Sequence, residues 1–373
     1  QSLDAWYWML DLPITSRVKV IGGIRYESTR IATTIEPDTP ATSVLLDGQV
    51  RADLGLPVGG STDVNSIPGG VEVLNVDLEQ EDILPSIGVV IEPLEGLTLR
   101  AAYSETIARP TFRELTPVSQ VLFGGETPFV GNPFIELSSV DNIDFRVDYR
   151  PFQESLFSIS YFRKDIDDVI QVVQQAQASS ELIIPVNFPS GEVRGWEFEA
   201  RQGLGRLDER LRGLTIGGNA TLLDTQVTLR DFESGQLAAV GAPQSTVAMT
   251  NAPDFLYNLF LTYDAQASGT QLSLFWTFRG DTLIATPGVA NETADGGQFF
   301  VPGIVEKEFG TLNFTLTQQL GKYFSLKFSA ENLTNPKRQT VFRSDFVPGG
   351  DVVKTSFTQG IDLSVSLGGS FEF

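Results

Sequence analysis

The sequence predicts an all-β protein, and more narrowly a transmembrane antiparallel β-barrel. Apolar and polar side chains alternate in runs of about 9–11 residues, the length that a tilted strand needs to cross a bilayer. No window of comparable length has a helical period, and no apolar stretch reaches the ~18 residues of a membrane-spanning helix. The connections alternate between short and long, as the periplasmic turns and extracellular loops of such barrels do.

The alternation is clearest in the second half of the chain. Residues 311–318 place Leu312, Phe314 and Leu316 on one face of a strand, and residues 271–279 and 323–331 follow the same pattern. Two architectures share this pattern. In a soluble sandwich the apolar side chains point inward, whereas in an outer-membrane barrel they face lipid and the polar side chains line a wet interior.

Three further observations favour the outer-membrane barrel. The polar positions carry full charges, such as Arg100, Arg146, Lys327 and Glu331, where a sandwich surface needs only small polar groups. Aromatic residues gather near the ends of the runs, as in the girdles of membrane barrels. Several of the expected loops exceed ~20 residues, which is uncommon in a compact soluble domain.

The short connections define the predicted strands in order. Six hairpins and one final strand are expected, at roughly 4–12 with 16–34, 83–93 with 97–108, 138–150 with 154–171, 183–202 with 213–229, 253–264 with 269–285, 306–319 with 322–341, and 355–373. The long loops are expected roughly at 35–82, 109–137, 172–183, 229–252, 285–305 and 341–355. This makes about thirteen strands.

An odd number of strands cannot close an antiparallel barrel, and a sheet that spans lipid must close. We therefore expect preceding strands that this chain does not contain. About 13 of 22 strands would be present, so that residues 1–373 are the carboxyl-terminal portion of one outer-membrane β-barrel domain. The first residues, QSLDAWYWMLDLP, lack the basic start of a signal peptide.

Composition excludes several classes of function. The net charge of −21 argues against nucleic acid, which needs a basic face. The absence of Cys and His removes thiol nucleophiles, Ser-His-Asp hydrolases and most zinc sites. Carboxylate pairs and calcium sites are not excluded by composition.

Several stretches, taken together and in order, resemble TonB-dependent outer-membrane receptors. The segment AAYSETIARPTFRELTP (101–117) resembles the strand that rises into a loop with an Arg-Pro pair, and GNPFIELSSVDNIDFRVDYRP (131–151) resembles the next element. Residues 83–93, 191–200 and 328–339 fit the same barrels. The terminal Phe373, with Phe371, matches the aromatic carboxyl-terminal signal that the barrel-assembly machinery reads.

The resemblance implies active uptake of a scarce bulky nutrient across the Gram-negative outer membrane. An oligosaccharide, an iron chelate or a similar cargo is expected, with the carbohydrate-linked receptors as the closest group. The plug and the TonB box of such receptors are expected upstream and are not recognisable here. The implied partners are outer-membrane lipid and lipopolysaccharide, the TonB-ExbB-ExbD complex acting through the missing plug, and the barrel-assembly machinery, with a surface lipoprotein as a further candidate.

Ligand and lumen candidates follow from strand parity and from the resemblance. Parity places Arg100, Arg146, Arg279 and Lys327 on the inner face, where they line a cargo path or pair with carboxylates such as Asp148. The resemblance places Arg109, Arg113 and Glu114 at the entrance to the lumen. An alternative for Arg109 is structural, because Pro110 restricts the backbone of the residue before it.

No catalytic residue, cofactor or resident metal is expected. Adventitious calcium at the acidic loop tips 231–236 and 291–298 is one interpretation of those segments, whereas the acidic stretch 163–171 lacks the spacing of a calcium loop. Two other functions are kept as alternatives: a passive porin-like or scaffold barrel, and a soluble β-rich carbohydrate-active enzyme with an Asp/Glu pair.

Overall fold

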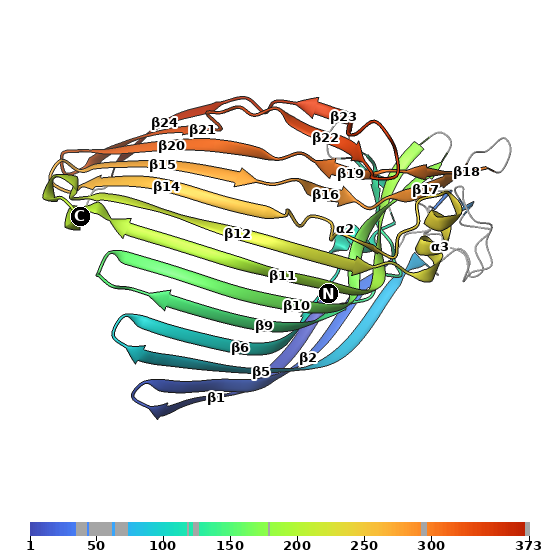
Figure 1. Cartoon of the computed structure of the whole chain (residues 1–373), viewed down its shortest axis with the longest axis horizontal. Helices are drawn as coiled ribbons and strands as arrows, with labels where there is room; N and C mark the ends of the chain where they lie inside the picture. The colour runs from blue at the N-terminus through green and yellow to red at the C-terminus, as the bar shows by residue number, and fades with distance from the viewer. Residues whose placement is uncertain are drawn as a thin grey trace.

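The computed structural model describes residues 1–34, 43–44, 62–63, 74–117, 119–121, 127–177, 180–291 and 297–369. Thirteen long strands, each antiparallel to the next, form one curved wall (Figure 1). In spatial order they are β1 (Ser2–Thr15), β2 (Val18–Thr33), β5 (Val76–Leu94), β6 (Leu97–Ala108), β9 (Ser138–Tyr149), β10 (Ser155–Gln177), β11 (Ser180–Gly203), β12 (Leu214–Thr228), β14 (Phe255–Ala265), β15 (Thr270–Arg279), β20 (Phe309–Leu320), β21 (Phe324–Glu331) and β24 (Asp362–Gly369).

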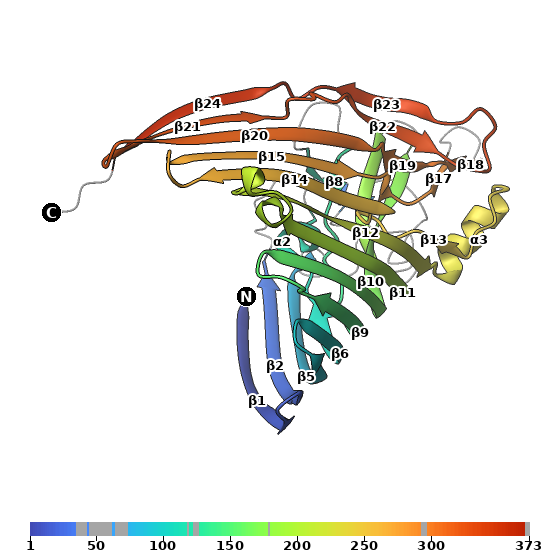
Figure 2. The same ribbon diagram turned by 60° about the vertical axis from the view of Figure 1, so that its left-hand side comes forward.

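The wall is open. Among the described residues β1 pairs only with β2, and β24 pairs only with β21. Figure 2 shows these two strands at opposite ends of the curved sheet. The short connections between neighbouring strands are tight turns. β5 and β6 are joined through Gly96 (φ +80°), and β20 and β21 through Gly321 (φ +70°). Glycine adopts such positive φ values without strain.

The strand register separates the side chains into two faces that run unbroken across the wall. One row of cross-strand partners is Phe145, Tyr161, Trp196 and Leu222, on β9, β10, β11 and β12. The same parity continues to Trp276 on β15. We call this the apolar face, and the opposite side the polar face. Because a bilayer accepts only the apolar face, the polar face is the inner, water-facing one.

Large apolar side chains on the apolar face are exposed. Phe145 is 51% exposed, Trp196 46% and Leu259 53%. In water such a surface would be unstable, but it is the surface that a lipid environment requires. Leu326 and Phe328 lie on this face and Lys327 on the other. The predicted alternation of apolar and polar faces is therefore confirmed, and the lipid-facing assignment of the apolar face stays a prediction.

Three predicted strands were too long. The predicted segments 269–285, 322–341 and 355–373 each divide into two, and their outer parts belong to a second sheet. That sheet contains β16 (Thr282–Ala285), β19 (Gly303–Glu306), β22 (Arg338–Arg343) and β23 (Val352–Phe357). Two of the three breaks, in 322–341 and 355–373, coincide with residues of positive φ, namely Asn332 (+56°), Asn335 (+40°) and Gly360 (+86°), which end a regular strand.

The predicted loop at 172–183 is wrong. β10 and β11 remain paired up to Gln177 and Ser180, so they form a long hairpin that rises beyond the rest of the wall. Its apolar side chains, among them Val173, Ile184 and Phe188, are buried in a cluster with Val227 of β12. Burial of this cluster explains why strand structure extends past the membrane-spanning part.

Short elements complete the end of the molecule that carries the long connections. The strands β7 (Ser119–Gln120), β8 (Phe129–Val130), β13 (Thr246–Val247), β17 (Gly288–Asn291) and β18 (Gln298–Val301) join the main sheet, and β3 (Ser43–Val44) pairs with β4 (Thr62–Asp63). The expected loop tip at 231–236 is instead part of the helix α3 (Asp231–Ala239), whose Leu237 packs into the hairpin cluster. No helix within the described segments is long and apolar enough to span a membrane.

Candidate functional site

Near the short turns, the polar face carries a cluster of ion pairs built from neighbouring strands. Arg146 Nε lies 2.8 Å from Asp148 Oδ1, and its guanidinium also lies 3.2 Å from Glu199. Arg100, from β6, donates to the other oxygen of Asp148, and Ser158 Oγ donates to Asp148 Oδ1 at 2.8 Å. The Asp148 side chain is only 2% exposed. This carboxylate on β9 therefore contacts both neighbouring strands, β6 through Arg100 and β10 through Ser158.

A second cluster fixes the loop that follows β6. Arg109 donates to Glu27 and, through Nε, to Thr29 Oγ1 at 3.1 Å, and Arg25 also donates to Glu27. The Glu27 side chain is 8% exposed. Arg109 thus ties the start of the 109–117 segment to the inner face of β2.

The helix α2 (Phe112–Leu115) accounts for the two remaining loop candidates. Glu114 forms a capping box with Thr111: its carboxylate accepts from the Thr111 backbone N–H at 2.7 Å, and its own N–H donates to Thr111 Oγ1 at 3.3 Å. The Arg113 guanidinium lies 4.2 Å from the centroid of the Phe129 ring. The α2 residue Leu115 is buried against Ile31 and Val76. Both charged residues therefore have local structural contacts.

A third cluster lies where β15 and β20 leave the membrane-spanning wall. Arg279 and Arg338 both bind Glu306, and their guanidinium groups lie 4.9 Å and 4.4 Å from the centroid of the Phe309 ring. Phe309 is the direct cross-strand partner of Arg279, so the ring and both cations share the inner face. We call this the Phe309 cluster. Arg279 Nε is buried and has no hydrogen-bond partner among the described residues.

Next to the Phe309 cluster, four charged residues form a network between the strands of the second sheet. Arg343 lies 2.7 Å from both Asp281 and Asp351, and Lys307 lies 3.0 Å from Asp281. The hydrogen bonds from Arg343 lower the pKa of Asp351 below its usual value. Burial raises the pKa of Asp281, but the hydrogen bonds from Arg343 and Lys307 outweigh it, so that this pKa is also lowered.

The predicted candidates are thus spread over separate places along the wall. Lys327 is exposed on the polar face and forms no ion pair with another described residue. Phe371 and Phe373 lie outside the described residues. The described part of the chain contains no group of three or more side chains able to hold a metal ion. The ligand and assembly roles of all these residues stay predictions.

Parity reasoning missed several residues of these clusters. Glu306 and Arg338 belong to segments where the predicted strands break, so no alternation indicated their face. Phe309 lies at the first position of β20, where its side chain falls on the polar face although it is aromatic. In contrast, the sequence pattern did indicate the face of Asp148, because Asp148 follows Arg146 by two residues on the same strand.

A comparison with protein families identifies the class. Residues 1–333 match the model described as "TonB dependent receptor-like, beta-barrel", and the chain belongs to this family. It is accordingly a Gram-negative outer-membrane β-barrel protein. No curated sequence matches the chain significantly.

Solved structures of outer-membrane receptors share the fold. The ferric-catecholate import receptor Fiu of E. coli K12 is 12% identical with a TM-score of 0.56, and the match covers 99% of this chain and 44% of Fiu. The copper transporter OprC is 14% identical (TM-score 0.59; 99% and 48% covered). The ferric enterobactin receptor PfeA of Pseudomonas aeruginosa, solved with enterobactin, is 16% identical (TM-score 0.54; 99% and 54% covered). The chain spans about half the length of these proteins.

The Asp148 cluster leads to a stability prediction. Asp148→Asn removes the charge shared by Arg100 and Arg146, and we expect it to lower the free energy of unfolding by about 2 kcal/mol, measured by urea unfolding in lipid vesicles. Breaking a fully buried ion pair costs ~3–5 kcal/mol, and an exposed pair contributes ~0–1 kcal/mol. The expected loss of stability lies between these values because Asp148 is buried whereas both arginines are partly exposed. The control is Asp11→Asn, which removes the exposed Lys19–Asp11 pair. If both substitutions lower the free energy of unfolding equally, the structural role given to Asp148 is contradicted.

The Asp281–Arg343–Asp351 network leads to a pH prediction. A carboxyl whose folded pKa is lowered stabilises the fold above its ordinary pKa, and this contribution is lost as the pH falls below about 4 towards the folded pKa. We expect hydrogen-exchange protection factors of β22 and β23 to fall between pH 6 and pH 3, whereas those of β14 and β15 change less. In the Arg343→Gln variant, β22 and β23 should already have lower protection factors at pH 6 than in the unmodified protein. If the protection factors of this variant fall with pH as much as those of the unmodified protein, the assignment is refuted.

Proposed function

We propose that this chain forms part of the barrel wall of a TonB-dependent transporter that takes up a scarce, bulky nutrient across the outer membrane. The observation that carries the proposal is the polar face, because charged side chains follow one another along the inside of the wall from the short turns to the long-connection end. Membership of the family supports the same function.

In this mechanism the wall is a rigid channel and the chain breaks no bond in the cargo. The ion pairs of Asp148 and Glu27 hold the strands and the first loop in place. A plug outside this chain would block the lumen, and the TonB-ExbB-ExbD complex would pull on the plug to open it. Catalytic residues therefore have no part in the proposal.

The Phe309 cluster is the best-supported contact for cargo. An aromatic ring with two arginines presents a flat apolar surface beside a net positive charge, since Glu306 neutralises only one of the two cations. Such a surface stacks on planar or sugar rings and binds anionic groups by charge-assisted hydrogen bonds. An iron chelate and an acidic oligosaccharide both meet these requirements.

Uptake measured in cells tests this function. We expect a strain that produces the protein to accumulate a ferric catecholate chelate or a labelled acidic oligosaccharide, in a manner that requires TonB and is abolished by a protonophore. Arg338→Gln should lower the rate about tenfold at equal surface abundance, the value of one charge-assisted hydrogen bond. Arg210→Gln, in the exposed turn between β11 and β12, is the matched control.

Uptake that is equal with and without TonB would contradict active transport. In that case the purified protein should give a steady conductance in planar bilayers, as a passive porin does. Equal uptake by the Arg338→Gln and Arg210→Gln variants would reject the Phe309 cluster as a cargo contact and leave the transport function standing.

A further inference from the structure

Two phenylalanine rings lie side by side on the polar face, where the alternation places polar side chains. Phe260 on β14 and Phe275 on β15 are direct cross-strand partners, and they alternate along their strands with Leu259 and Trp276 of the apolar face. The two ring centroids are 6.1 Å apart, and the ring planes are inclined by 38°. Phe275 is 43% exposed. We call these two residues the ring pair. Exposed aromatic surface on a water-facing side is the kind of patch that marks a binding site.

The backbone of β12 extends the apolar surface of the ring pair. Gly217 is the cross-strand partner of Phe260. A Cβ atom at Gly217 would lie 2.4 Å from Cζ of the Phe260 ring, which is closer than two carbon atoms can pack. The Phe260 ring therefore lies over the backbone of β12, and the ring pair forms one apolar surface that reaches from β12 to β15.

A row of neutral hydrogen-bonding groups lies next to the ring pair, two residues further towards the long connections. Asn219, Asn258 and Thr277 are successive cross-strand partners on β12, β14 and β15. Asn258 Nδ2 donates to Asn219 Oδ1 at 2.9 Å, and Thr277 Oγ1 donates to Asn258 Oδ1 at 2.8 Å. These two bonds use one N–H group of Asn258 and neither N–H group of Asn219, so the row has donors and acceptors left for a ligand. We call it the amide row.

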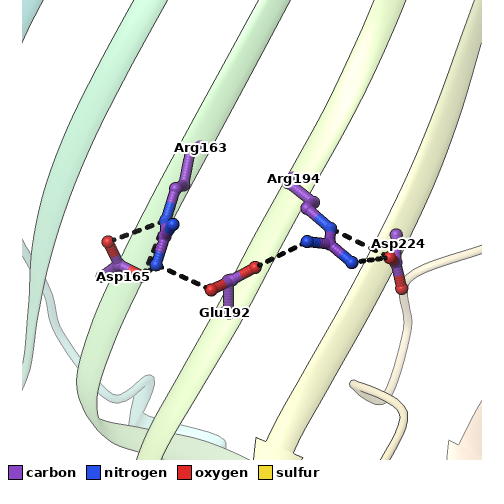
Figure 3. Close-up of polar contacts among 5 residues, drawn as sticks. All are labelled: Arg163, Asp165, Glu192, Arg194 and Asp224. Carbon is purple, nitrogen blue, oxygen red and sulfur yellow. Dashed lines mark hydrogen bonds and ion pairs between the residues drawn. The ribbon is translucent and has the colours of Figure 1, made fainter.

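Charge distinguishes this part of the wall from the neighbouring strands. On β10, β11 and β12 a ladder of five charged residues, from Arg163 to Asp224, lies on the apolar face beyond its aromatic row (Figure 3), and the Asp148 cluster lies on the polar face. The polar-face positions of β15 and β20 nearest to the ring pair are uncharged, namely Ser273, Thr277, Thr311, Asn313 and Thr315. A charged ligand would lose hydration at the ring pair without gaining an opposite charge.

We propose that the ring pair and the amide row bind one neutral sugar ring of an oligosaccharide cargo. The apolar C–H face of the sugar would lie on Phe275 and Phe260, and its hydroxyl groups would exchange hydrogen bonds with the amide row. An anionic iron chelate lacks a counter-charge here. The inference rests on the proposed transport function and narrows its cargo to a saccharide.

The spacing between the ring pair and the Phe309 cluster fits one extended ligand. Phe275 and Arg279 are four residues apart on β15, which is roughly 13 Å along the strand at ~3.3 Å per residue. Thr277 and its cross-strand partner Thr311 lie between them on the same face. A chain of several sugar rings would therefore place a neutral ring on the ring pair and an acidic group at the Phe309 cluster.

Saturation-transfer NMR on the protein purified from outer membranes tests the site. The probes are maltohexaose and xylohexaose, which are neutral oligosaccharides, and the ferric complex of 2,3-dihydroxybenzoate, which is an anionic chelate. We expect transfer to the ring C–H protons of at least one oligosaccharide, and competition by the chelate should be weak. Absence of transfer to both oligosaccharides, or full displacement of the bound oligosaccharide by the chelate, would overturn the proposal.

Substitutions locate the site on the wall. Phe275→Ala and Asn258→Leu should each weaken oligosaccharide binding about fivefold, the value of one stacking contact or one hydrogen bond. Phe275→Trp keeps a stacking surface and should bind at least as tightly as the unmodified protein, which separates loss of binding from loss of folding. Phe314→Ala, the same substitution on the apolar face of β20, is the matched control and should not change binding.

Equal oligosaccharide binding by the Phe275→Ala and Phe314→Ala variants would overturn the proposal and would favour the ring pair as a contact for the plug. The binding assay contains no TonB, so its outcome is separate from that of the uptake experiment. If oligosaccharide binding fails while TonB-dependent uptake is found, only this inference is lost. If binding is found and uptake does not need TonB, the proposed function is lost and the sugar site stands in a passive barrel.

Discussion

The constraint on which the structure depends is that no backbone N–H or C=O can be left unpaired inside a bilayer. The thirteen long strands meet it by pairing with each neighbour, with register shifts between Pro13 and Thr15 and between Ile91 and Leu94, whereas the outer edges of β1 and β24 have no partner among the described residues. Register then decides the face of every side chain, because a shift of one residue would exchange the two faces. The apolar row through Tyr161 and Trp196 and the polar row through Arg146 are consequences of the same hydrogen-bond pattern.

The polar face shows how such a wall carries charge without becoming disordered. Glu27, Asp148 and Glu306 each accept from two arginines, and at least one arginine of each pair comes from a segment that is distant in sequence. Ion pairs of this kind contribute little to stability when exposed, but they fix geometry when one partner is buried. We infer that these pairs make the wall rigid, and the proposed cargo contact lies towards the long-connection end, where the Phe309 ring is on the inner face.

Sequence reasoning predicted the wall well because alternation is a direct consequence of strand geometry. The number and order of the long strands, and the faces of Arg146 and Arg279, followed from it. It failed where tertiary burial or backbone conformation decides the outcome. The 172–183 segment stays paired because its apolar side chains are buried, and the breaks near Asn332 and Asn335 depend on positive φ values that alternation does not encode. The clusters around Glu306 lie beyond such breaks, which is why they were missed.

The central claim is that the alternating rows separate lipid from water, and single-cysteine labelling tests it most directly because the chain contains no cysteine. Cysteines would be placed one at a time at 312–316 on β20, where Leu312, Phe314 and Leu316 have apolar-face parity and Asn313 and Thr315 the opposite one. In outer membranes, a membrane-impermeant maleimide is expected to react at 313 and 315, and a lipid-soluble probe at 312, 314 and 316. The same reactivity at all five positions, or the reverse alternation, would contradict the account.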